Sequence, residues 1–309
     1  MSLEHVFDEM EIRADPFALC ELQGRCDLGL DRRPSATLHY ILAGRGEILV
    51  QGRPPIVIDR GTLVLIPALR SHTLRSFGDR RDPVPDCHPA ELDLVQHLQT
   101  SDGSEQEGKL LALCSHVTVG VRGTQDLIDL IREPIVETVS PGSRIKPAVD
   151  QMLQEISAPQ AGSRAMIRAL LLECMIQLLR NRLKARDRSL NWMVALKDRS
   201  VWAALERMLE TPGDAHSVES LADAAGMSRS TFAKRFAEAY GSGPMELLRD
   251  LRMRLAASLL EDSELPVKRI AELAGFQSRS AFTRTFESVT GTSPSDFRAE
   301  IRAGRERIR

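Results

Sequence analysis

The sequence lacks a long apolar segment. Nowhere in its 309 residues is there a run of about 18 apolar residues of the kind that crosses a membrane. The first residues, MSLEHVFDEMEIRADP, also lack the apolar core of a signal peptide. The sequence therefore predicts a soluble, cytoplasmic protein.

A disulfide or zinc framework is also lacking. The five cysteines stand at irregular spacings, and none belongs to a CxxC pair: Cys20, Cys26, Cys87, Cys114 and Cys174. An odd number of irregularly spaced cysteines fits reduced thiols better than a set of disulfides. The absence of CxxC argues against a structural zinc site.

The chain has no overall excess of positive charge, because its formal net charge is -2. Any charge that binds nucleic acid must therefore be local. Such a local surplus occurs at residues 265–309, which contain nine Lys or Arg against five Asp or Glu.

Two halves of the chain differ in periodicity. Residues 17–121 contain short β-prone runs separated by turn residues, including the polar loop QTSDGSEQEGK, and indicate a small sandwich or barrel. From Gln125 onward, beginning in TQDLIDLIREP, nearly everything reads as helical. The length is comfortable for two domains. We predict an α+β protein with one domain at 1–190 and an all-α domain at 198–309.

The helical half contains an internal repeat. The stretch LADAAGMSRSTFAKRFAEAYGSGPMEL (221–247) aligns with IAELAGFQSRSAFTRTFESVTGTSPSDF (270–297), with one extra residue in the second copy. In each copy a short amphipathic helix ends at a glycine, Gly226 or Gly275, and a serine follows that can cap the next helix. Helix, tight turn and helix form the helix-turn-helix pattern, here duplicated.

The second helix of each unit has one apolar and one polar face. Two phenylalanines four residues apart predict the buried face. The opposite face carries side chains that donate to bases and phosphates, and an arrangement of this kind seen twice is difficult to explain as a merely solvated face. The predicted DNA-contacting residues are Arg229, Ser230, Thr231, Lys234, Arg279, Ser280, Thr283 and Arg284.

Residues 202–309 resemble the DNA-binding domain of AraC/XylS-type transcription regulators. That family joins two helix-turn-helix units by a long helix, which PMELLRDLRMRLAASLLEDS matches here. The resemblance implies that both units read successive major grooves on one side of double-stranded DNA, about 34 Å apart. It also implies a homodimer. RNA polymerase is a further candidate partner.

The β half resembles the cupin-like domain that precedes this DNA-binding domain in many members. GTLVLIPALRSH fits the second cupin motif, and His39 falls at a metal position of the first. His39 and His72 are of a residue type that binds divalent metals, but Thr37 replaces a partner histidine and the required glutamate is missing. We therefore expect hydrogen-bonded core histidines, no metal and no catalytic residues.

A helix at residues 163–186 supplies one candidate ligand site. Its polar stripe marks a solvent face, and nearly opposite lie Arg164 and Arg168, in line with an apolar row that we interpret as the surface for a partner helix in a dimer: Leu171, Met175 and Leu178. Two arginines four residues apart repel unless an anion lies between them. The spacing is similar to the arginine motif with which PilZ domains bind cyclic di-GMP, although the companion motif is not intact in DGSEQEG.

The sequence leaves other sensors open. Cys20 and Cys26 are close together, and Cys87 stands next to His88, so oxidants acting on thiols are one alternative. A sugar in the cupin-like domain is another. The sequence predicts a DNA-binding transcription regulator controlled by an effector, with an anionic ligand such as cyclic di-GMP on Arg164 and Arg168 as the sharpest candidate. The rival classes are a metal-dependent cupin enzyme with a DNA-binding tail and a constitutive architectural protein.

Overall fold

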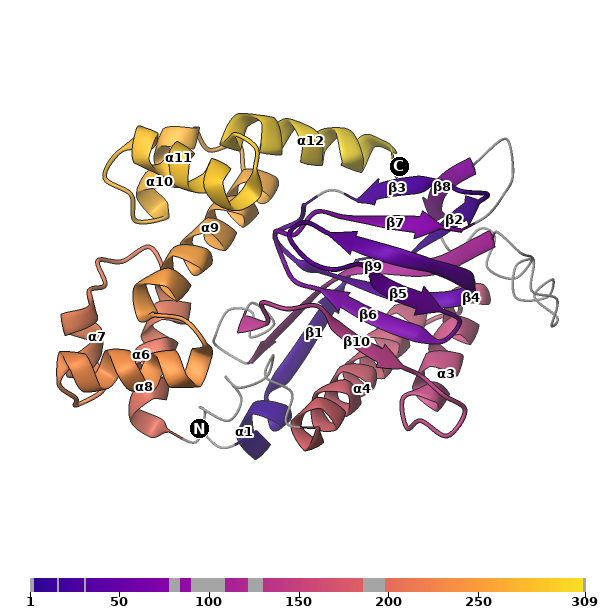
Figure 1. The fold of residues 1–309 in the computed structure, drawn as a ribbon, viewed down its shortest axis with the longest axis horizontal. Helices are drawn as coiled ribbons and strands as arrows, with labels where there is room; N and C mark the ends of the chain where they lie inside the picture. The colour runs from indigo at the N-terminus through magenta and orange to yellow at the C-terminus, as the bar shows by residue number, and fades with distance from the viewer. Residues whose placement is uncertain are drawn as a thin grey trace.

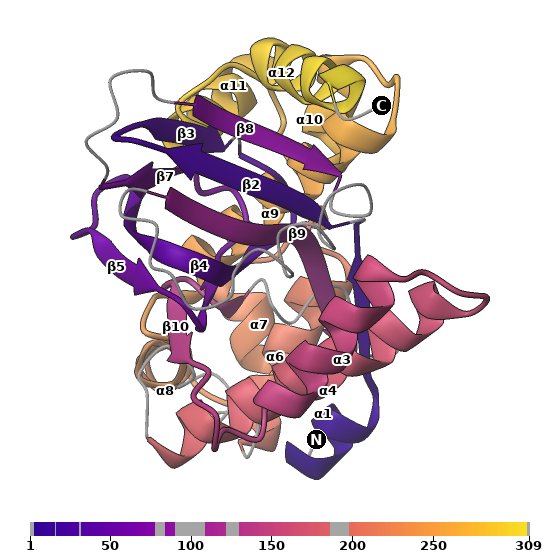
Figure 2. The same cartoon turned by 90° about the vertical axis from the view of Figure 1, so that its right-hand side faces the viewer.

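The structure is a computed structural model that describes residues 3–15, 17–30, 32–77, 84–89, 109–121, 130–185 and 198–307. It consists of a curled antiparallel sheet with helices packed on one side, followed by a part made only of helices (Figures 1 and 2). No helix of the described residues is long and apolar enough to cross a lipid bilayer. The α+β fold predicted from the sequence is confirmed.

The β-strands of the described residues all lie in the first half of the chain. They are β1 (Met10–Ala14), β2 (Ala18–Gln23), β3 (Asp27–Leu30), β4 (Ala36–Val50), β5 (Ile56–Asp59), β6 (Thr62–Ile66), β7 (His72–Ser76), β8 (Val84–Pro89), β9 (Lys109–Val121) and β10 (Ile135–Thr138).

One described helix precedes the first strand, and the others follow the last strand. They are α1 (Leu3–Asp8), α3 (Lys146–Ser157), α4 (Ser163–Lys184), α6 (Arg199–Glu210), α7 (Val218–Ala224), α8 (Arg229–Tyr240), α9 (Pro244–Asp262), α10 (Val267–Leu273), α11 (Arg279–Thr290) and α12 (Pro294–Arg307).

Strand β4 gives the sheet its curl because it pairs with different partners along its length. The main order is β10–β6–β4–β9–β2–β8, whereas the second part of β4 pairs with β5 and β7. A bulge between Ile41 and Ala43 interrupts the pairing with β9, and a bulge bends the strand that carries it. At Gly44 a β-carbon would collide with the carbonyl oxygen of Lys109, so only glycine fits where the two backbones approach.

The interior of the curled sheet is filled with aliphatic side chains. Fully buried residues from six strands form this cluster, among them Leu22, Ile41, Ile48, Ile58, Val64, Ile66, Leu74 and Leu110. Alternation of inward and outward residues along each strand puts a second apolar surface on the outside of the sheet.

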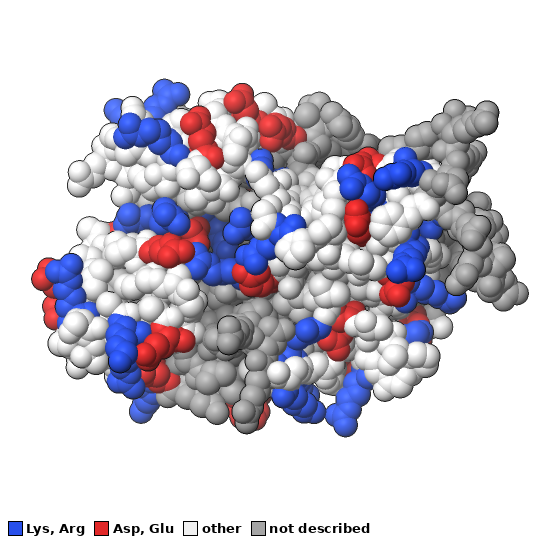
Figure 3. Space-filling view, viewed as in Figure 1, with Lys and Arg blue, Asp and Glu red and all other residues white. Residues whose placement is uncertain are grey.

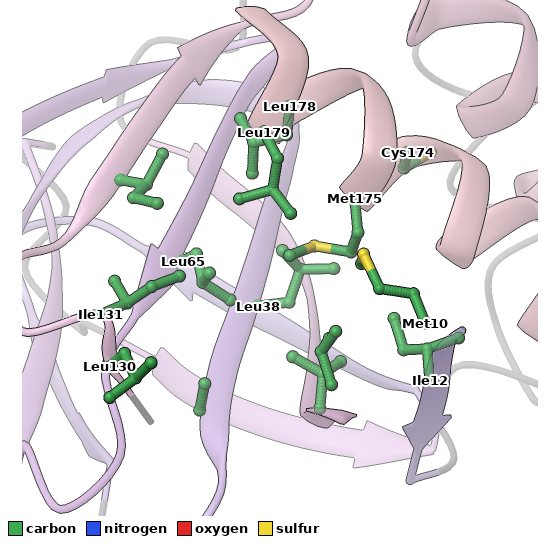
Figure 4. Close-up of a cluster of buried hydrophobic side chains, with 14 of the residues drawn as sticks. Met10, Ile12, Leu38, Leu65, Leu130, Ile131, Cys174, Met175, Leu178 and Leu179 are labelled. Atoms are coloured by element: carbon green, nitrogen blue, oxygen red, sulfur yellow. The ribbon is translucent and has the colours of Figure 1, made fainter. Parts of the chain in front are cut away.

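Helix α4 covers that outer surface. Figure 4 shows Met175, Leu178 and Leu179 of α4 lying over Leu38 and Leu65 of the sheet. Leu171, Met175 and Leu178 are at most 1% exposed. The interpretation of this row as a dimer surface is therefore wrong: the chain's own sheet covers it.

A second correction concerns residues 135–138, which the sequence reading assigned to the helical half. They form β10, which pairs with β6 from Ile135 to Thr138. Three of the four residues, in the stretch IVET, are β-branched, and such residues pack well in a sheet. Residues 122–129, with most of TQDLIDLIREP, and residues 90–108, with DGSEQEG and most of QTSDGSEQEGK, lie outside the described residues.

The helical part is divided into two units that α9 joins. In Figure 1, α6–α8 form the lower lobe, α10–α12 form the upper lobe, and α9 runs between them. The cores of the two units belong to different apolar clusters. The first unit shares one cluster with α4 and the outer face of the sheet, while the second unit has a cluster of its own around Phe282, Phe286 and Phe297.

Candidate nucleic-acid interface

The turn between the two helices of each unit has the same geometry in both copies. Gly226 and Gly275 adopt φ values of 63° and 77°, in the left-handed region that favours glycine. The backbone N–H of Met227 donates to Ala222 at 3.0 Å, and that of Phe276 donates to Ala271 at 2.9 Å. These bonds satisfy carbonyls at the helix end and set the angle at which the next helix leaves.

Serine caps the second helix of each unit, as the sequence predicts. The side chain of Ser228 accepts from the backbone N–H of Thr231 at 3.3 Å, and that of Ser278 accepts from Ala281 at 3.2 Å. Each bond satisfies one of the free donors at a helix start and fixes where the helix begins.

The phenylalanine pairs hold α8 and α11 against their units. Phe232 and Phe236 are 0% exposed with ring centroids 5.5 Å apart, and Phe282 and Phe286 are 0% exposed with centroids 5.6 Å apart. Burial of these rings turns the opposite face of each helix outward.

That outward face carries the predicted DNA-contacting side chains. Those exposed to solvent are Arg229, Ser230, Thr231, Lys234, Arg279, Ser280 and Arg284, and Thr283 is half-buried. Within the described part of the chain, none of the four cations has an ion-pair partner, so their charge is available to phosphates and base edges. Thr231 also accepts from the Ser228 hydroxyl at 2.8 Å. Contact with DNA by these eight residues stays a prediction.

One basic residue of α8 has a structural partner instead. The guanidinium of Arg235 lies 2.9 Å from the carboxylate of Asp198. Asp198 also caps α6, where it accepts from Val201 at 3.3 Å. This pair links α8 to α6 and thereby orients the first recognition helix.

The two units touch through backbone atoms, which sequence reasoning missed. A β-carbon on Gly213, in the loop after α6, would collide with the carbonyl oxygen of Leu273 at the end of α10. One on Gly275 would lie 2.5 Å from the Gly213 carbonyl oxygen. Arg252 of α9 donates to both sides of Gly213, at 2.9 Å to Pro212 and 2.8 Å to Asp214. This contact fixes the orientation of the two units relative to each other.

Arginines of the N-terminal part pair with carboxylates along α9. Arg132 forms ion pairs with Asp250 and with Glu246, the latter at 3.2 Å, near the start of α9. Near its end, Arg33 pairs with Glu261 at 2.9 Å. In Figure 3, Lys and Arg side chains gather at the centre of the molecule, where the helical part meets the sheet. The two parts are thus connected at the helix that joins the recognition units.

The two cupin-motif histidines face each other inside the sheet. His39 and His72 are 0% and 3% exposed, and their Nε2 atoms lie 2.7 Å apart. Burial lowers the pKa of His39 well below its usual value and that of His72 to about 4, so both rings are neutral near pH 7. The described residues contain no group of three or more His, Cys, Asp or Glu side chains arranged to hold a metal ion. Both are the hydrogen-bonded core histidines that the sequence predicts.

The cysteines are arranged differently from the sequence expectation. Cys20 of β2 lies directly opposite Cys87 of β8 in the antiparallel register, and their Sγ atoms are 2.6 Å apart. Cys20 is 0% exposed, whereas Cys87 is exposed. Cys26 lies instead beside Ser76, with Sγ and Oγ 3.5 Å apart. The thiol next to Cys20 is therefore Cys87, which no sequence spacing reveals because 67 residues separate them.

Arg164 and Arg168 lie on the first two turns of α4. Both are exposed, and among the described residues neither has an ion-pair partner. At the other end of the same helix, Arg182 pairs with Glu137 at 2.8 Å. The structure thus leaves Arg164 and Arg168 open to an anion from solvent.

The fold and the site define a class: a curled-sheet domain joined to a two-unit helix-turn-helix domain whose recognition faces are exposed. Comparison with known proteins identifies the family. Residues 2–184 match the Cupin family, and residues 221–300 match the Helix-turn-helix domain family. An AraC-like transcription regulator of Streptomyces antibioticus is 35% identical over 305 residues, which cover 96% of this chain and 97% of that protein. The chain belongs to the AraC-like transcription regulators and is a DNA-binding regulator.

One further relative and one solved structure also resemble this chain over most of its length. The HTH-type transcriptional regulator AlkR of Acinetobacter baylyi is 24% identical over 305 residues, covering 97% of this chain and 99% of that protein. The structure of ToxT from Vibrio cholerae has a similar fold, with a TM-score of 0.51 at 10% identity over 93% of this chain and 98% of that one.

Proposed function

We propose that this transcription regulator responds to oxidants through the thiol pair Cys20–Cys87 in its N-terminal domain. The observation that supports the proposal is the 2.6 Å separation of the two Sγ atoms on neighbouring strands. Residues directly opposite each other in an antiparallel sheet have Cα atoms about 4.5–5.5 Å apart, within the range that a disulfide spans. The pair therefore needs no rearrangement of the backbone to form a bond.

The exposures of the two thiols assign them different roles. Cys87 is exposed and meets the oxidant first, while Cys20 is buried and acts as the resolving thiol. A peroxide oxidises the Cys87 thiol to a sulfenic acid and is reduced to water or an alcohol. The Cys20 sulfur then attacks the sulfenic sulfur, the S–S bond forms, and the oxygen leaves as a second water.

Controlled oxidation tests this function. The wild-type protein and Cys87→Ser are treated with hydrogen peroxide, and their affinity is measured for a duplex that the reduced wild type has selected from a random pool. We expect the wild type to lose two hydrogens by mass and to change affinity, reversibly with dithiothreitol, and Cys87→Ser to do neither. Cys174→Ser is the matched control, because Cys174 is a buried residue of α4, away from the pair on β2 and β8. An unchanged affinity in fully disulfide-bonded wild type would refute the proposal.

A second candidate effector is an anionic ligand held by Arg164 and Arg168, with cyclic di-GMP as the specific candidate. It is supported by the exposure of both guanidinium groups on successive turns of one helix. Phosphate oxygens can accept bidentate bonds from such groups and relieve the repulsion between them.

Thermal denaturation tests this candidate. A ligand that binds only the folded state stabilises it by about 2.7 kcal/mol at a hundredfold excess over Kd. We expect cyclic di-GMP to raise the Tm of the wild type and of Lys184→Ala, an exposed cation at the far end of α4, but not of Arg164→Ala/Arg168→Ala. Equal shifts in all three proteins, or in none, would remove the site.

The homodimer is also part of the proposal. With the apolar row of α4 buried, the outer face of the helix is the surface left for a second copy, and it carries Met166, which is 50% exposed, beside exposed Ala165 and Ala169. Met166→Glu should shift sedimentation toward the monomer. RNA polymerase contact stays a prediction for transcription assays. The filled interior of the sheet does not favour a sugar there.

A further inference from the structure

Leu69 connects the N-terminal domain to the second helix-turn-helix unit. Its side chain is 5% exposed and belongs to the apolar core of α9–α12, with Phe282 and Phe286. Among the described residues outside α9–α12, it is the one member of that cluster. A side chain of the loop between β6 and β7 is therefore built into the core of a DNA-reading unit.

The loop holds Leu69 in an unusual conformation. Its φ is 60°, in the left-handed region, which is an outlier for a large side chain and persists only where surrounding contacts enforce it. One such contact is the bond from its backbone N–H to the carbonyl of Arg33 at 2.8 Å. Arg33 itself pairs with Glu261 of α9 at 2.9 Å, so the loop and α9 share an anchor.

The next residue of the loop is attached to the buried histidines. His72 Nδ1 lies 3.3 Å from the carbonyl oxygen of Arg70. His39 Nε2 lies 2.7 Å from His72 Nε2, and His39 Nδ1 lies 3.0 Å from the Sγ of Cys114 on β9. These contacts form a continuous chain from Cys114 in the sheet to the loop that carries Leu69.

The partners in this chain determine where the protons are. A carbonyl only accepts, so His72 carries its proton on Nδ1 and accepts at Nε2. Neutral His39 must then donate from Nε2 and accept at Nδ1, so the Cys114 thiol is the donor at 3.0 Å, in preference to the Ala112 carbonyl oxygen at 3.7 Å. All three bonds share one direction, so reversal of the bond between Cys114 and His39 goes with the opposite tautomer of both rings and releases the Arg70 carbonyl.

We propose that the Cys114–His39–His72 chain and the loop from Pro67 to Arg70 couple the interior of the N-terminal domain to the second helix-turn-helix unit, with Leu69 as the positioning residue. The bond to Arg70 holds the loop, and the loop holds Leu69 in the apolar core of α9–α12. The first unit is joined to the N-terminal domain in a different way, through the apolar cluster that it shares with α4 and the outer face of the sheet, and Leu69 is not part of that cluster. A change that passes along the histidine chain to the loop of Leu69 therefore reaches the second unit first. The biological role of this coupling rests on the proposed function, because the sensor supplies the change inside the sheet. The contacts that form the coupling are present without an effector.

Two substitutions at His72 separate the two ends of its ring. The amide nitrogen of His72→Asn stands near the position of Nδ1 and can donate to Arg70 as the ring does, whereas the amide of His72→Gln stands near Nε2, where its oxygen can accept from His39, and loses the bond to Arg70. Hydrogen exchange of the full-length protein is measured without DNA or effector, separately for α8 and for α10–α11. We expect His72→Gln and Leu69→Ala to accelerate exchange in α10–α11 several-fold with α8 unchanged, and His72→Asn to match the wild type.

Leu74→Ala is the control for general loss of stability, because Leu74 is fully buried on the same strand as His72 and takes no part in the Cys114–His39–His72 chain. Selective acceleration that is absent from Leu74→Ala supports the coupling. Equal exchange in α10–α11 of wild type, Leu69→Ala and His72→Gln, or an equal rise in Leu74→Ala, would overturn it. The measurement does not use peroxide, so its outcome is independent of the thiol-pair proposal.

Discussion

Gly213 and Leu273 belong to different helix-turn-helix units, yet the backbone of one leaves no room for a β-carbon on the other. Arg252 reinforces the contact by donating to the carbonyls on both sides of Gly213. Two recognition helices can occupy successive major grooves only at a fixed separation and angle. The contact thus contributes a constraint on orientation that the long helix α9 alone does not supply.

Gly213→Ala should therefore weaken DNA binding by disturbing the orientation of the two units. The added methyl group meets a backbone carbonyl that has no rotamer to change, and overpacking of this kind costs typically about 1–3 kcal/mol. We expect a lower Tm and a larger loss of affinity for the selected duplex than for random DNA. Fluorescence anisotropy with both duplexes measures this difference.

Gly142→Ala is the matched control for Gly213→Ala, because a β-carbon at Gly142 has nothing within 4 Å. It should leave both the Tm and the affinity near those of the wild type. If Gly213→Ala binds the selected duplex and random DNA with the same affinities as the wild type, the contact between the units does not set their orientation.

Arg279 and Arg284 are predicted to read base edges from α11. Replacement of either by Ala should weaken binding to the selected duplex by about 1–3 kcal/mol, because an arginine bound to a base contributes that much discrimination. Binding to random DNA should change less, since phosphate contacts dominate there. Titrations of both variants at one salt concentration give the ratio of the two affinities.

The control is Arg269→Ala, which removes the same charge from an exposed position on α10, where Arg269 pairs with Glu272 at 2.9 Å. It should lower both affinities slightly and equally. Unchanged discrimination in both Arg279→Ala and Arg284→Ala would show that neither side chain reads a base.

The helical half was predictable because its signals are local. The glycine turns, the serine caps and the phenylalanine pairs all lie within about a dozen residues of one another, and each has one structural meaning. The confirmed caps at Ser228 and Ser278 are examples. The row of Leu171, Met175 and Leu178 was read wrongly for the opposite reason. An apolar stripe shows that a helix face is covered, and sequence does not say whether the cover is the same chain or a second one.

The candidate sensor depends on contacts that are distant in sequence. Cys20 meets Cys87 only because β2 pairs with β8 at the end of the strand order, in a register that places the two residues opposite each other. In the sequence, Leu69 is an ordinary apolar residue of the stretch GTLVLIPALRSH. Its burial in the core of the second helix-turn-helix unit follows only from how the two domains pack together. Single residues at such contacts carry no periodic signal.

In Cys20→Ser, oxidation of Cys87 should stop at the sulfenic acid and not go on to a disulfide. With no resolving sulfur opposite it, Cys87 would remain a sulfenic acid after brief treatment with peroxide, because only a thiol converts that group to a disulfide. Trapping with dimedone and peptide mass spectrometry should find the adduct on Cys87 in Cys20→Ser and little of it in the wild type. Cys26→Ser should behave as the wild type, since Cys26 neighbours Ser76. An adduct on Cys87 that is equal in all three proteins would remove Cys20 as the resolving thiol.

Acid should destabilise the folded protein through its buried histidines. Burial lowers the pKa of His72 and of His116 to about 4, from an ordinary value of about 6.5. As pH falls below about 6.5, these histidines become protonated in the unfolded chain but stay neutral in the folded chain. The free energy of unfolding that they contribute is therefore fully present above that pH and declines toward pH 4, by about 1.4 kcal/mol per pH unit for each group.

Urea denaturation at pH 7.5, 6 and 5 measures this decline, and His72→Gln identifies its source. Glutamine does not titrate, so the variant should lose less stability between pH 7.5 and pH 5 than the wild type, whatever its stability at the higher pH. The comparison of slopes cancels the carboxylates, which titrate alike in both proteins. Parallel curves for wild type and His72→Gln would mean that His72 takes its proton equally in both states, and would contradict the burial of a neutral His39–His72 pair.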